Sequence, residues 1–351
     1  MEAHRRGGFA GLASALAFGA SAPLAQRLVQ GRDPQLLAGL LYAGAAAVLW
    51  LVGRSATRHE APLRRADVSR LAAVTAFGGV AGPVLLLVGL QHVSGTTGAL
   101  TLNLEAPFTA VLAVVWFGEY LGTRGWVAGA VIVAGAAILA VTPSALGGDV
   151  LGVSLIAGAC ACWAIDNNLT QQLTTRDPVS IVRVKASVAA VVNLAIAAAR
   201  GSALPGLGII AATLALGAVS YGLSVVLDAY ALRLIGAARE AALFATAPFA
   251  GVVLAVGLGE PFTVVSAVAL GLMAVGAGGL LIVRHSHEHI HEPFAHEHRH
   301  VHDAHHSHEH PVGVDPSVPH THLHQHERLV HAHEHVSDAH HRHRHPRLLK
   351  S

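Results

Sequence analysis

Apolar residues fill the first 283 positions in runs of about 20, separated by short polar or glycine-rich connections. A helix of about 20 residues crosses the ~30 Å hydrocarbon layer of a lipid bilayer. The pattern therefore predicts an all-α integral membrane protein whose first partner is the bilayer. Ten transmembrane helices are expected, at residues 9–26, 34–53, 68–91, 95–117, 124–142, 150–171, 179–199, 206–229, 237–257 and 263–283.

An internal repeat divides this apolar region. An Ala-Pro-Phe triplet around Pro107 recurs around Pro248, 141 residues later, and the acid of a Gly-Glu pair follows each proline by twelve residues. These acids, Glu119 and Glu260, close the fourth and ninth spans, where we expect them to fix loops rather than contact a substrate. The same spacing at the same place in each half indicates two copies of one five-helix unit.

An odd number of spans in each copy inverts the second copy in the membrane. The expected division is a first repeat at 1–145, a second repeat at 146–283 and a tail at 284–351. Inverted repeats are typical of secondary transporters, which bind a substrate near the midplane and alternate access between the two sides. The sequence therefore predicts a transporter of a small molecule.

Two five-helix units with a proline in the fourth helix and Gly-Glu at its end resemble the EamA-type transporters of the drug/metabolite transporter superfamily. The resemblance covers residues 8–283 and implies a ten-helix basket with a central cavity, usually exporting amino acids, metabolites or drugs. The hexapeptide Asn-Leu-Glu-Ala-Pro-Phe, which begins at Asn103, is similar to the fourth-helix pattern of that family. Thr246 replaces the acid in the second copy, so a symmetric carboxylate role is not expected.

Composition agrees with a membrane protein, since 53% of the residues are hydrophobic and 13% are charged, against about 25% charged in soluble domains. Scattered basic residues and a net charge of +2 exclude nucleic acid as a partner. The apolar region has no GxSxG or P-loop pattern, so no enzyme and no required cofactor are expected. Cys160 and Cys162 lie inside one span, which excludes a disulfide framework.

Arginine in the loops sets the expected orientation, because positive loops stay on the cytoplasmic side. Counted with the N-terminus inside, eleven arginines fall inside and three, Arg27, Arg32 and Arg200, fall outside. We therefore expect a multi-pass protein of the cytoplasmic (inner) membrane with both termini inside. A cleaved signal peptide is the alternative for the first span. The inside set is Arg5, Arg6, Arg54, Arg58, Arg64, Arg65, Arg70, Arg124, Arg176, Arg233 and Arg239.

Ionisable groups inside a membrane cost at least about 2.5–3.5 kcal/mol and therefore need a reason. Glu105 lies near the centre of the fourth span, close to Asn103 and two residues before Pro107, which frees a backbone carbonyl. Glu105 is either a proton-coupling carboxylate or cation ligand, or a neutral, hydrogen-bonded packing residue.

The sixth span contains the densest polar cluster, with Trp163, Asp166, Asn167 and Thr170 about one turn apart. This cluster either lines a cavity or forms a helix end wetted by lipid headgroups.

Further polar residues lie in the seventh and eighth spans. Tyr221 and Asp228, seven residues apart, are expected on one helix face as part of the substrate site. Arg183 and Lys185 either reach the interface by snorkelling, or pair with Asp166 or Asp228, or hold an anionic substrate.

The tail contains 23 of the 26 histidines in a His-x-His pattern with few apolar residues, which predicts disorder. Its two HExxH matches are rejected as a protease signature, because that motif requires a fixed helix. Neutral imidazole binds divalent transition metals, so the tail is a candidate metal site or, alternatively, a solvated pH-responsive segment. The candidate ligands are His287, His289, His291, His296, His298, His300, His302, His305, His306, His308 and His310.

Together these features favour a secondary transporter, acting as an exporter of a small polar metabolite. One alternative is a transition-metal (Ni, Co or Zn) transporter that uses the tail to gather ions. Another is a membrane-anchored metal-binding protein that transports nothing.

Overall fold

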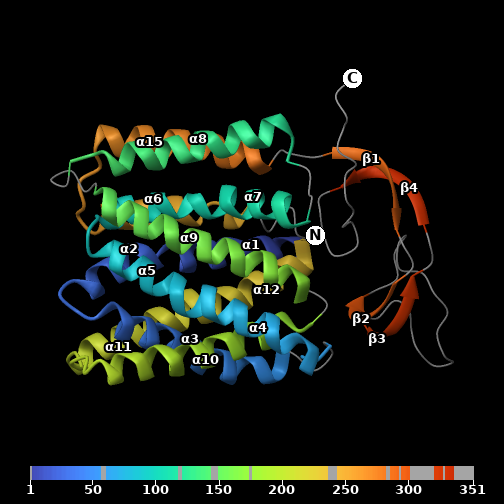
Figure 1. The fold of residues 1–351 in the computed structure, drawn as a ribbon, viewed down its shortest axis with the longest axis horizontal. Helices are drawn as coiled ribbons and strands as arrows, with labels where there is room; N and C mark the ends of the chain where they lie inside the picture. Colours follow the sequence, from blue (N-terminus) through green and yellow to red (C-terminus); the bar gives the residue numbers. More distant parts are fainter. Residues whose placement is uncertain are drawn as a thin grey trace.

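The structure is a computed structural model. Its described residues are 2–56, 61–117, 121–143, 149–173, 176–235 and 243–281, followed by four strands in the tail. In Figure 1 the helices of the body lie side by side along one common direction, and the strands lie beyond the helix ends on the side of the N-terminus. The expectation of an all-α body is confirmed.

The first half consists of helices separated by short connections. Its elements are α1 (Glu2–Gly19), α2 (Ser21–Val29), α3 (Pro34–Ala56), η1 (Arg65–Asp67), α4 (Val68–Val74), η2 (Thr75–Ala81), α5 (Gly82–Leu90), α6 (Gly95–Thr101), η3 (Leu102–Leu104), α7 (Glu105–Phe117) and α8 (Gly122–Ala140). The second half repeats the order. Its elements are α9 (Val150–Thr170), η5 (Gln171–Leu173), α10 (Pro178–Ala199), α11 (Leu207–Gly217), η6 (Ala218–Leu223), α12 (Ser224–Ile235), α14 (Ala247–Gly257) and α15 (Val264–Leu281).

Eight stretches of the described chain are long and apolar enough to cross a membrane, and they correspond to the first eight predicted spans. Two shorter apolar helices, Ala247–Gly257 and Val264–Leu280, correspond to the last two. The ninth predicted span begins at residue 237, and residues 236–242 lie outside the described residues. The total of ten therefore stays a prediction.

Helix pairing follows the internal repeat. Helix α3 packs on α10 and α8 packs on α15, which are equivalent positions in the two halves. The contact of α5 with α9 has its counterpart in α12 with α1, and α7 with α9 has its counterpart in α14 with α1. Each contact recurs with the halves exchanged, as a two-fold relation between inverted copies requires.

Glycines let these paired helices approach closely. A Cβ on Gly135 would lie 3.3 Å from the carbonyl oxygen of Ala269, and a Cβ on Gly276 would lie 2.7 Å from that of Ala128. The two glycines, like the two alanines, are 141 residues apart. The α8–α15 contact is therefore built twice from the same residue positions, as expected where membrane helices associate by packing.

Two spans that the sequence predicts as regular helices contain π-helical segments. They are η2 in the third span and η6 in the eighth, at nearly equivalent places in the two halves. Such segments widen the helical turn and are frequent at functional sites. The hydrophobic pattern gives no sign of them, because both segments are as apolar as their surroundings.

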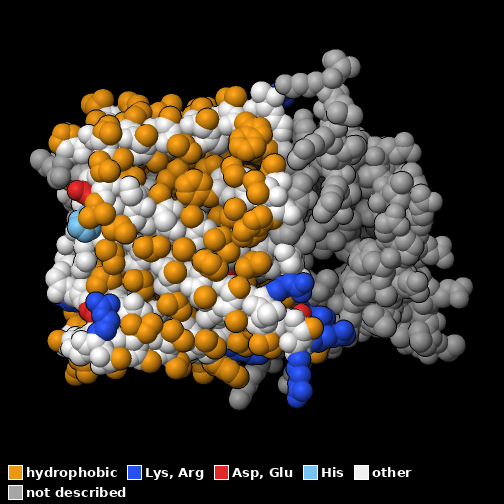
Figure 2. Space-filling model, viewed as in Figure 1, with side chains coloured by type: hydrophobic (Ala, Val, Ile, Leu, Met, Phe, Trp, Pro, Cys, Tyr) orange, Lys and Arg blue, Asp and Glu red, His pale blue; other side chains and the backbone are white. Residues whose placement is uncertain are grey.

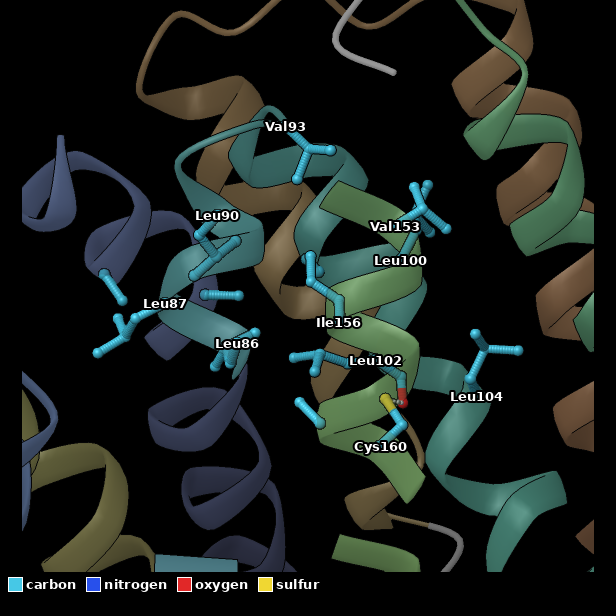
Figure 3. Close-up of a cluster of buried hydrophobic side chains, with 14 of the residues drawn as sticks. Leu86, Leu87, Leu90, Val93, Leu100, Leu102, Leu104, Val153, Ile156 and Cys160 are labelled. Atoms are coloured by element: carbon cyan, nitrogen blue, oxygen red, sulfur yellow. Dashed lines mark hydrogen bonds between the residues drawn. The ribbon is translucent and has the colours of Figure 1, made fainter. Parts of the chain in front are cut away.

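Buried apolar side chains fill the space between α5, α6 and α9. Leu86, Leu90, Leu100 and Ile156 are each at most 1% exposed, and Figure 3 shows them with their side chains gathered between these helices. This cluster joins the third and fourth spans of the first half to the first span of the second half. The two copies thus share one core.

The outer surface is also apolar. Figure 2 shows hydrophobic side chains spread over the described face, with basic side chains gathered towards the two ends of the helices. Such a surface suits lipid contact, since a soluble protein rarely exposes an apolar patch of this extent. Large side chains that are at least 45% exposed include Trp50, Leu51, Val115, Trp116, Trp126, Val191, Val253 and Val275.

Four short strands are described within the tail. The structure describes β1 (His285–His291), β2 (Phe294–His300), β3 (His320–His326) and β4 (Leu329–His335). The two HExxH matches lie in β1 and β2 rather than on a helix, which agrees with rejecting the protease reading. The alternating His-x-His pattern has the two-residue period of a strand.

Substitution of Gly276 by leucine should destabilise the α8–α15 contact by about 1–3 kcal/mol, because the new side chain would overpack the interface. Thermal unfolding in detergent measures the loss. Gly271→Leu on the same helix is the matched control, since a Cβ there meets nothing within 4 Å. Equal melting temperatures for the two variants would contradict the packing argument.

Candidate functional site

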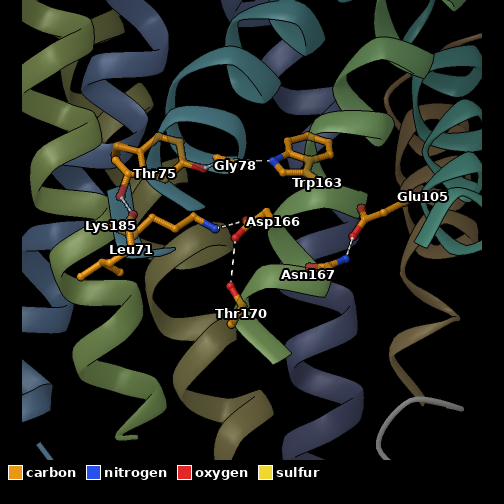
Figure 4. Close-up of polar contacts among 10 residues, drawn as sticks. Leu71, Thr75, Gly78, Glu105, Trp163, Asp166, Asn167, Thr170 and Lys185 are labelled. Atoms are coloured by element: carbon orange, nitrogen blue, oxygen red, sulfur yellow. Dashed lines mark hydrogen bonds and ion pairs between the residues drawn. The ribbon is translucent and has the colours of Figure 1, made fainter. Parts of the chain in front are cut away.

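An ion pair lies inside the membrane-spanning region between the two helices that open the second half. Asp166 on α9 is 4% exposed and accepts a hydrogen bond from Lys185 Nζ on α10. Thr170 Oγ1 donates to the other carboxylate oxygen at 3.0 Å, as Figure 4 shows. Snorkelling is therefore the wrong interpretation for Lys185, and pairing with Asp166 is confirmed.

Arg183, two residues earlier on α10, behaves differently. Its guanidinium carbon lies 4.7 Å from the ring centre of Trp50 on α3, a cation–π arrangement. One of its terminal nitrogens donates to Ser180 Oγ at 2.9 Å. The cations of the seventh span therefore have separate partners, and only Lys185 joins the intramembrane acids.

The π-helical segment η2 supplies two carbonyl groups to the same region. Gly82 N–H bonds to Phe77 O, one residue further back than in an α-helix, and Pro83 has no N–H to donate. The carbonyls of Gly78 and Gly79 therefore lose their α-helical donors, and side chains replace them.

Three side chains donate to these carbonyls. Gly78 O accepts from Tyr42 OH at 2.7 Å and from Trp163 Nε1 at 3.1 Å. Gly79 O accepts from Asn193 Nδ2 at 3.0 Å, and Asn193 Oδ1 accepts in turn from Gln35 Nε2 at 2.6 Å. These bonds join spans two, three, six and seven around the ion pair.

Glycine at position 78 is required by the ion pair. A Cβ there would lie 1.9 Å from Asp166 Oδ2, so any side chain would displace the carboxylate. The stem of Lys185 is also close, with its Cγ 3.7 Å from the place of a Cβ on Gly79. The backbone of η2 is therefore one wall of the charged site.

Glu105 lies on the other side of α9. It opens α7, and its Oε1 accepts a hydrogen bond from Asn167 Nδ2 at 2.7 Å. Adjacent residues of α9 thus face different partners, Asp166 towards Lys185 and Asn167 towards Glu105 (Figure 4). Among the described residues no ion pair involves Glu105. Of the two acids beside α9, Asp166 has a cation as its partner and Glu105 has a neutral amide.

Asn103 does not join this group. Its amide donates to Leu100 O at 2.9 Å and lies 3.8 Å from the sulfur of Met273, in the core. Pro107 is the third residue of α7, which continues directly from η3, and its ring nitrogen has no N–H to donate to the preceding turn. The structure therefore gives Asn103 local backbone and packing contacts.

Tyr221 lies close to the site through aromatic contacts. Its ring centre is 5.8 Å from that of Tyr42 and 6.0 Å from that of Phe18. The expectation that Asp228 shares its face assumed a regular α-helix, whereas Tyr221 belongs to the π-helical η6. No hydrogen bond or ion pair of Asp228 is found among the described residues.

The Gly-Glu pair of the second half joins the two repeats. The Glu260 carboxylate accepts from Gly95 N at 2.9 Å and from Thr96 N and Thr96 Oγ1, both at 2.8 Å. It thereby caps α6 of the first half, where backbone N–H groups lack helical partners. This agrees with the expected loop-fixing role of Glu260, and Pro248 lies in the first turn of α14. Glu119 lies outside the described residues.

Sequence reasoning missed several residues of the site, namely Gln35, Tyr42, Gly78, Gly79 and Asn193. Two signals were available. Pro83 inside a predicted span marks a helix with unpaired carbonyls, and the amides at 35 and 193 lie within apolar runs and so need partners. Where the structure describes the side chains of the helical region, between residues 5 and 280, no group of three or more His, Cys, Asp or Glu is arranged to hold a metal ion.

Apolar helices in two inverted copies, with paired charges within the spans, define a multi-pass membrane protein of the transporter class. Residues 5–141 and 150–282 both match the EamA-like transporter family. The chain belongs to this family.

A relative from Methanothermobacter thermautotrophicus, named an uncharacterized transporter, is 28% identical over 284 residues, which are 74% of this chain and 81% of that protein. A solved crystal structure with 17% sequence identity superposes with a TM-score of 0.58, over 79% of this chain and 98% of the other. That likeness supports the fold alone.

Replacing Lys185 by methionine should destabilise the protein by about 3–5 kcal/mol, because Asp166 would stay buried without its cation. The double variant Lys185→Met/Asp166→Leu should be more stable than the single variant. Thermal unfolding in detergent measures both.

Arg183→Met is the control on the same helix. It should lower the free energy of unfolding by about 0.5–2 kcal/mol, the range of a cation–π contact. If Lys185→Met lowered the stability no more than this control does, the ion pair would not be a buried structural interaction.

Proposed function

We propose that the protein is a secondary transporter that exports a small polar metabolite by alternating access. The observation that carries the proposal concerns two acids on opposite sides of α9: Asp166 is bound by Lys185, whereas the described partner of the Glu105 carboxylate is the Asn167 amide. Both acids lie within spans, where a charge needs a functional or structural reason. The ion pair with Lys185 gives Asp166 a structural role. Glu105 has no such partner among the described residues, so we assign it the functional role.

Exposure around Glu105 supports a water-filled path. Asn167 is exposed although it belongs to the span Val150–Leu173, while Asp166 beside it is buried. An amide and a carboxyl group facing lipid would be costly, so polar groups in spans face the bundle interior or water. Glu105 is also half-way along its own span, Gly95–Trp116, which is the depth at which secondary transporters bind substrate.

In this proposal Glu105 is the coupling group. Its carboxylate binds a proton from one side of the membrane and becomes neutral. A neutral group is less costly to bury than a charge, so the protonated protein can change from facing one side to facing the other. Asn167 Nδ2 holds the carboxylate form, while Trp163 and Tyr221 border the substrate path. Lys185 and Asp166 neutralise each other and keep α9 and α10 in place.

The inverted copies supply the movement. Equivalent contacts in the two halves, such as α5 with α9 and α12 with α1, allow two conformations that differ in which side is open. The excess of arginine in one set of loops supports placing both termini in the cytoplasm. No covalent chemistry is required, so no cofactor and no catalytic residue are proposed.

Glu105→Gln should abolish solute flux driven by a pH gradient in reconstituted vesicles, because glutamine still accepts the bond from Asn167 but cannot titrate. Flux driven by a solute gradient alone should persist. Asp149→Asn is the control, since Asp149 caps α9 and asparagine also caps helices well. Wild-type pH dependence in Glu105→Gln would refute the coupling role.

Truncation tests whether the cargo is an organic solute or a metal. A chain ending at Val283 should export the organic solute as fast as the full chain, with or without Ni²⁺, Zn²⁺ and Co²⁺. Flux of a metal ion that disappears on truncation would instead identify a metal transporter. Metal binding by the full chain without flux of any solute would favour a membrane-anchored metal-binding protein.

A further inference from the structure

The backbone pairing of the tail places histidines opposite one another. Strand β1 pairs antiparallel with β4, and β2 pairs antiparallel with β3. In each pair, histidine stands opposite histidine at three alternate positions. The facing positions are His285 and His335, His287 and His333, and His289 and His331 in one sheet, and His296 and His324, His298 and His322, and His300 and His320 in the other.

Alternate residues of a strand belong to the same face of a sheet, so the three facing pairs of each sheet occupy one face. We call each set of three pairs a histidine ladder. The positions between them carry mixed residues, for example Glu288 opposite Ala332 and Glu297 opposite Leu323. Histidine is thus collected on one face of each sheet, although it is spread over two distant segments of the sequence.

Facing positions in an antiparallel sheet have the spacing that a shared metal ion needs. Their Cβ atoms are about 4.5–5.5 Å apart, and diagonal neighbours are about 7–8 Å apart. Imidazole nitrogens bind Zn²⁺ at about 2.0–2.1 Å, so the separation of two facing positions is within the span that one ion can bridge. Two adjacent pairs place four histidine positions next to one another on one face, and four is the number of ligands in a closed tetrahedral site.

We propose that each histidine ladder is a binding site for a late first-row divalent ion such as Ni²⁺, Zn²⁺ or Co²⁺. Imidazole suits these ions. Polar two-stranded sheets with little apolar surface specify their register weakly, and an ion shared by facing histidines stabilises the register in which they meet. The tail then has two defined sites rather than a set of interchangeable histidines.

Three variants of the full-length protein, each lacking four histidines, test the proposal by calorimetric titration of metal-free protein with Ni²⁺. The single-ladder variant carries His287→Ala, His289→Ala, His331→Ala and His333→Ala. The split variant carries His287→Ala, His289→Ala, His322→Ala and His324→Ala, and thus breaks two pairs in each ladder. The outside variant carries His340→Ala, His341→Ala, His343→Ala and His345→Ala, beyond the strands.

The ladders predict different results for equal numbers of histidines. The single-ladder variant should bind half as many ions at wild-type affinity. The split variant should bind no ion at that affinity. Its affinity for Ni²⁺ should fall by more than about 10–100-fold, which is the loss on changing a residue that only supports a metal ligand. The outside variant should match the wild type. Equal losses in all three variants would show that only the number of histidines matters, and would overturn the proposal.

Cross-linking checks the register without metal. His287→Cys/His333→Cys should form a disulfide under mild oxidation, because facing Cα atoms are about 4.5–5.5 Å apart and disulfides span about 4.4–6.8 Å. The diagonal pair His287→Cys/His331→Cys should form it more slowly. Equal rates would contradict the pairing. Neither experiment depends on transport, so its outcome is separate from that of the Glu105 test.

Discussion

Within a bilayer, no water is available to a polar group that the protein leaves unpaired. Much of the described interior follows from this constraint. Pro83 and the π-helical segment leave the carbonyls of Gly78 and Gly79 without regular donors, and side chains from three other spans supply the missing bonds. Asp166 has Lys185 as its partner. At the Glu105–Asn167 pair, in contrast, the described residues give the carboxyl group a neutral hydrogen-bond donor and no counter-charge.

The backbone repeats almost symmetrically, but the chemistry does not. The π-helical segments and the α8–α15 glycines occur in both halves. At a distance of 141 residues, however, Glu105 corresponds to Thr246, Lys185 to Gly44 and Asp166 to Ala25. The charged site therefore exists at only one of two equivalent places. The two halves share a scaffold, and the charged groups occupy one of its two equivalent places.

Features with a periodic or repeated signal were predictable from the sequence. Long apolar runs located the spans, and the recurrence of Ala-Pro-Phe with Gly-Glu located the two copies. The partner of Lys185 was left open because a sequence of apolar helices does not specify which faces meet. The π-helical segments were missed because they change the helical turn without changing hydropathy.

The bonds of Glu260 have a mechanical consequence. This carboxylate belongs to the second half, and the α6 backbone that it caps belongs to the first. The halves cannot separate at this end of the bundle while all three bonds persist. A movement that separates the halves at this end must break all three hydrogen bonds. Otherwise the loop after α14 must move together with α6. A single side chain thus ties the two repeats together at this end of the bundle.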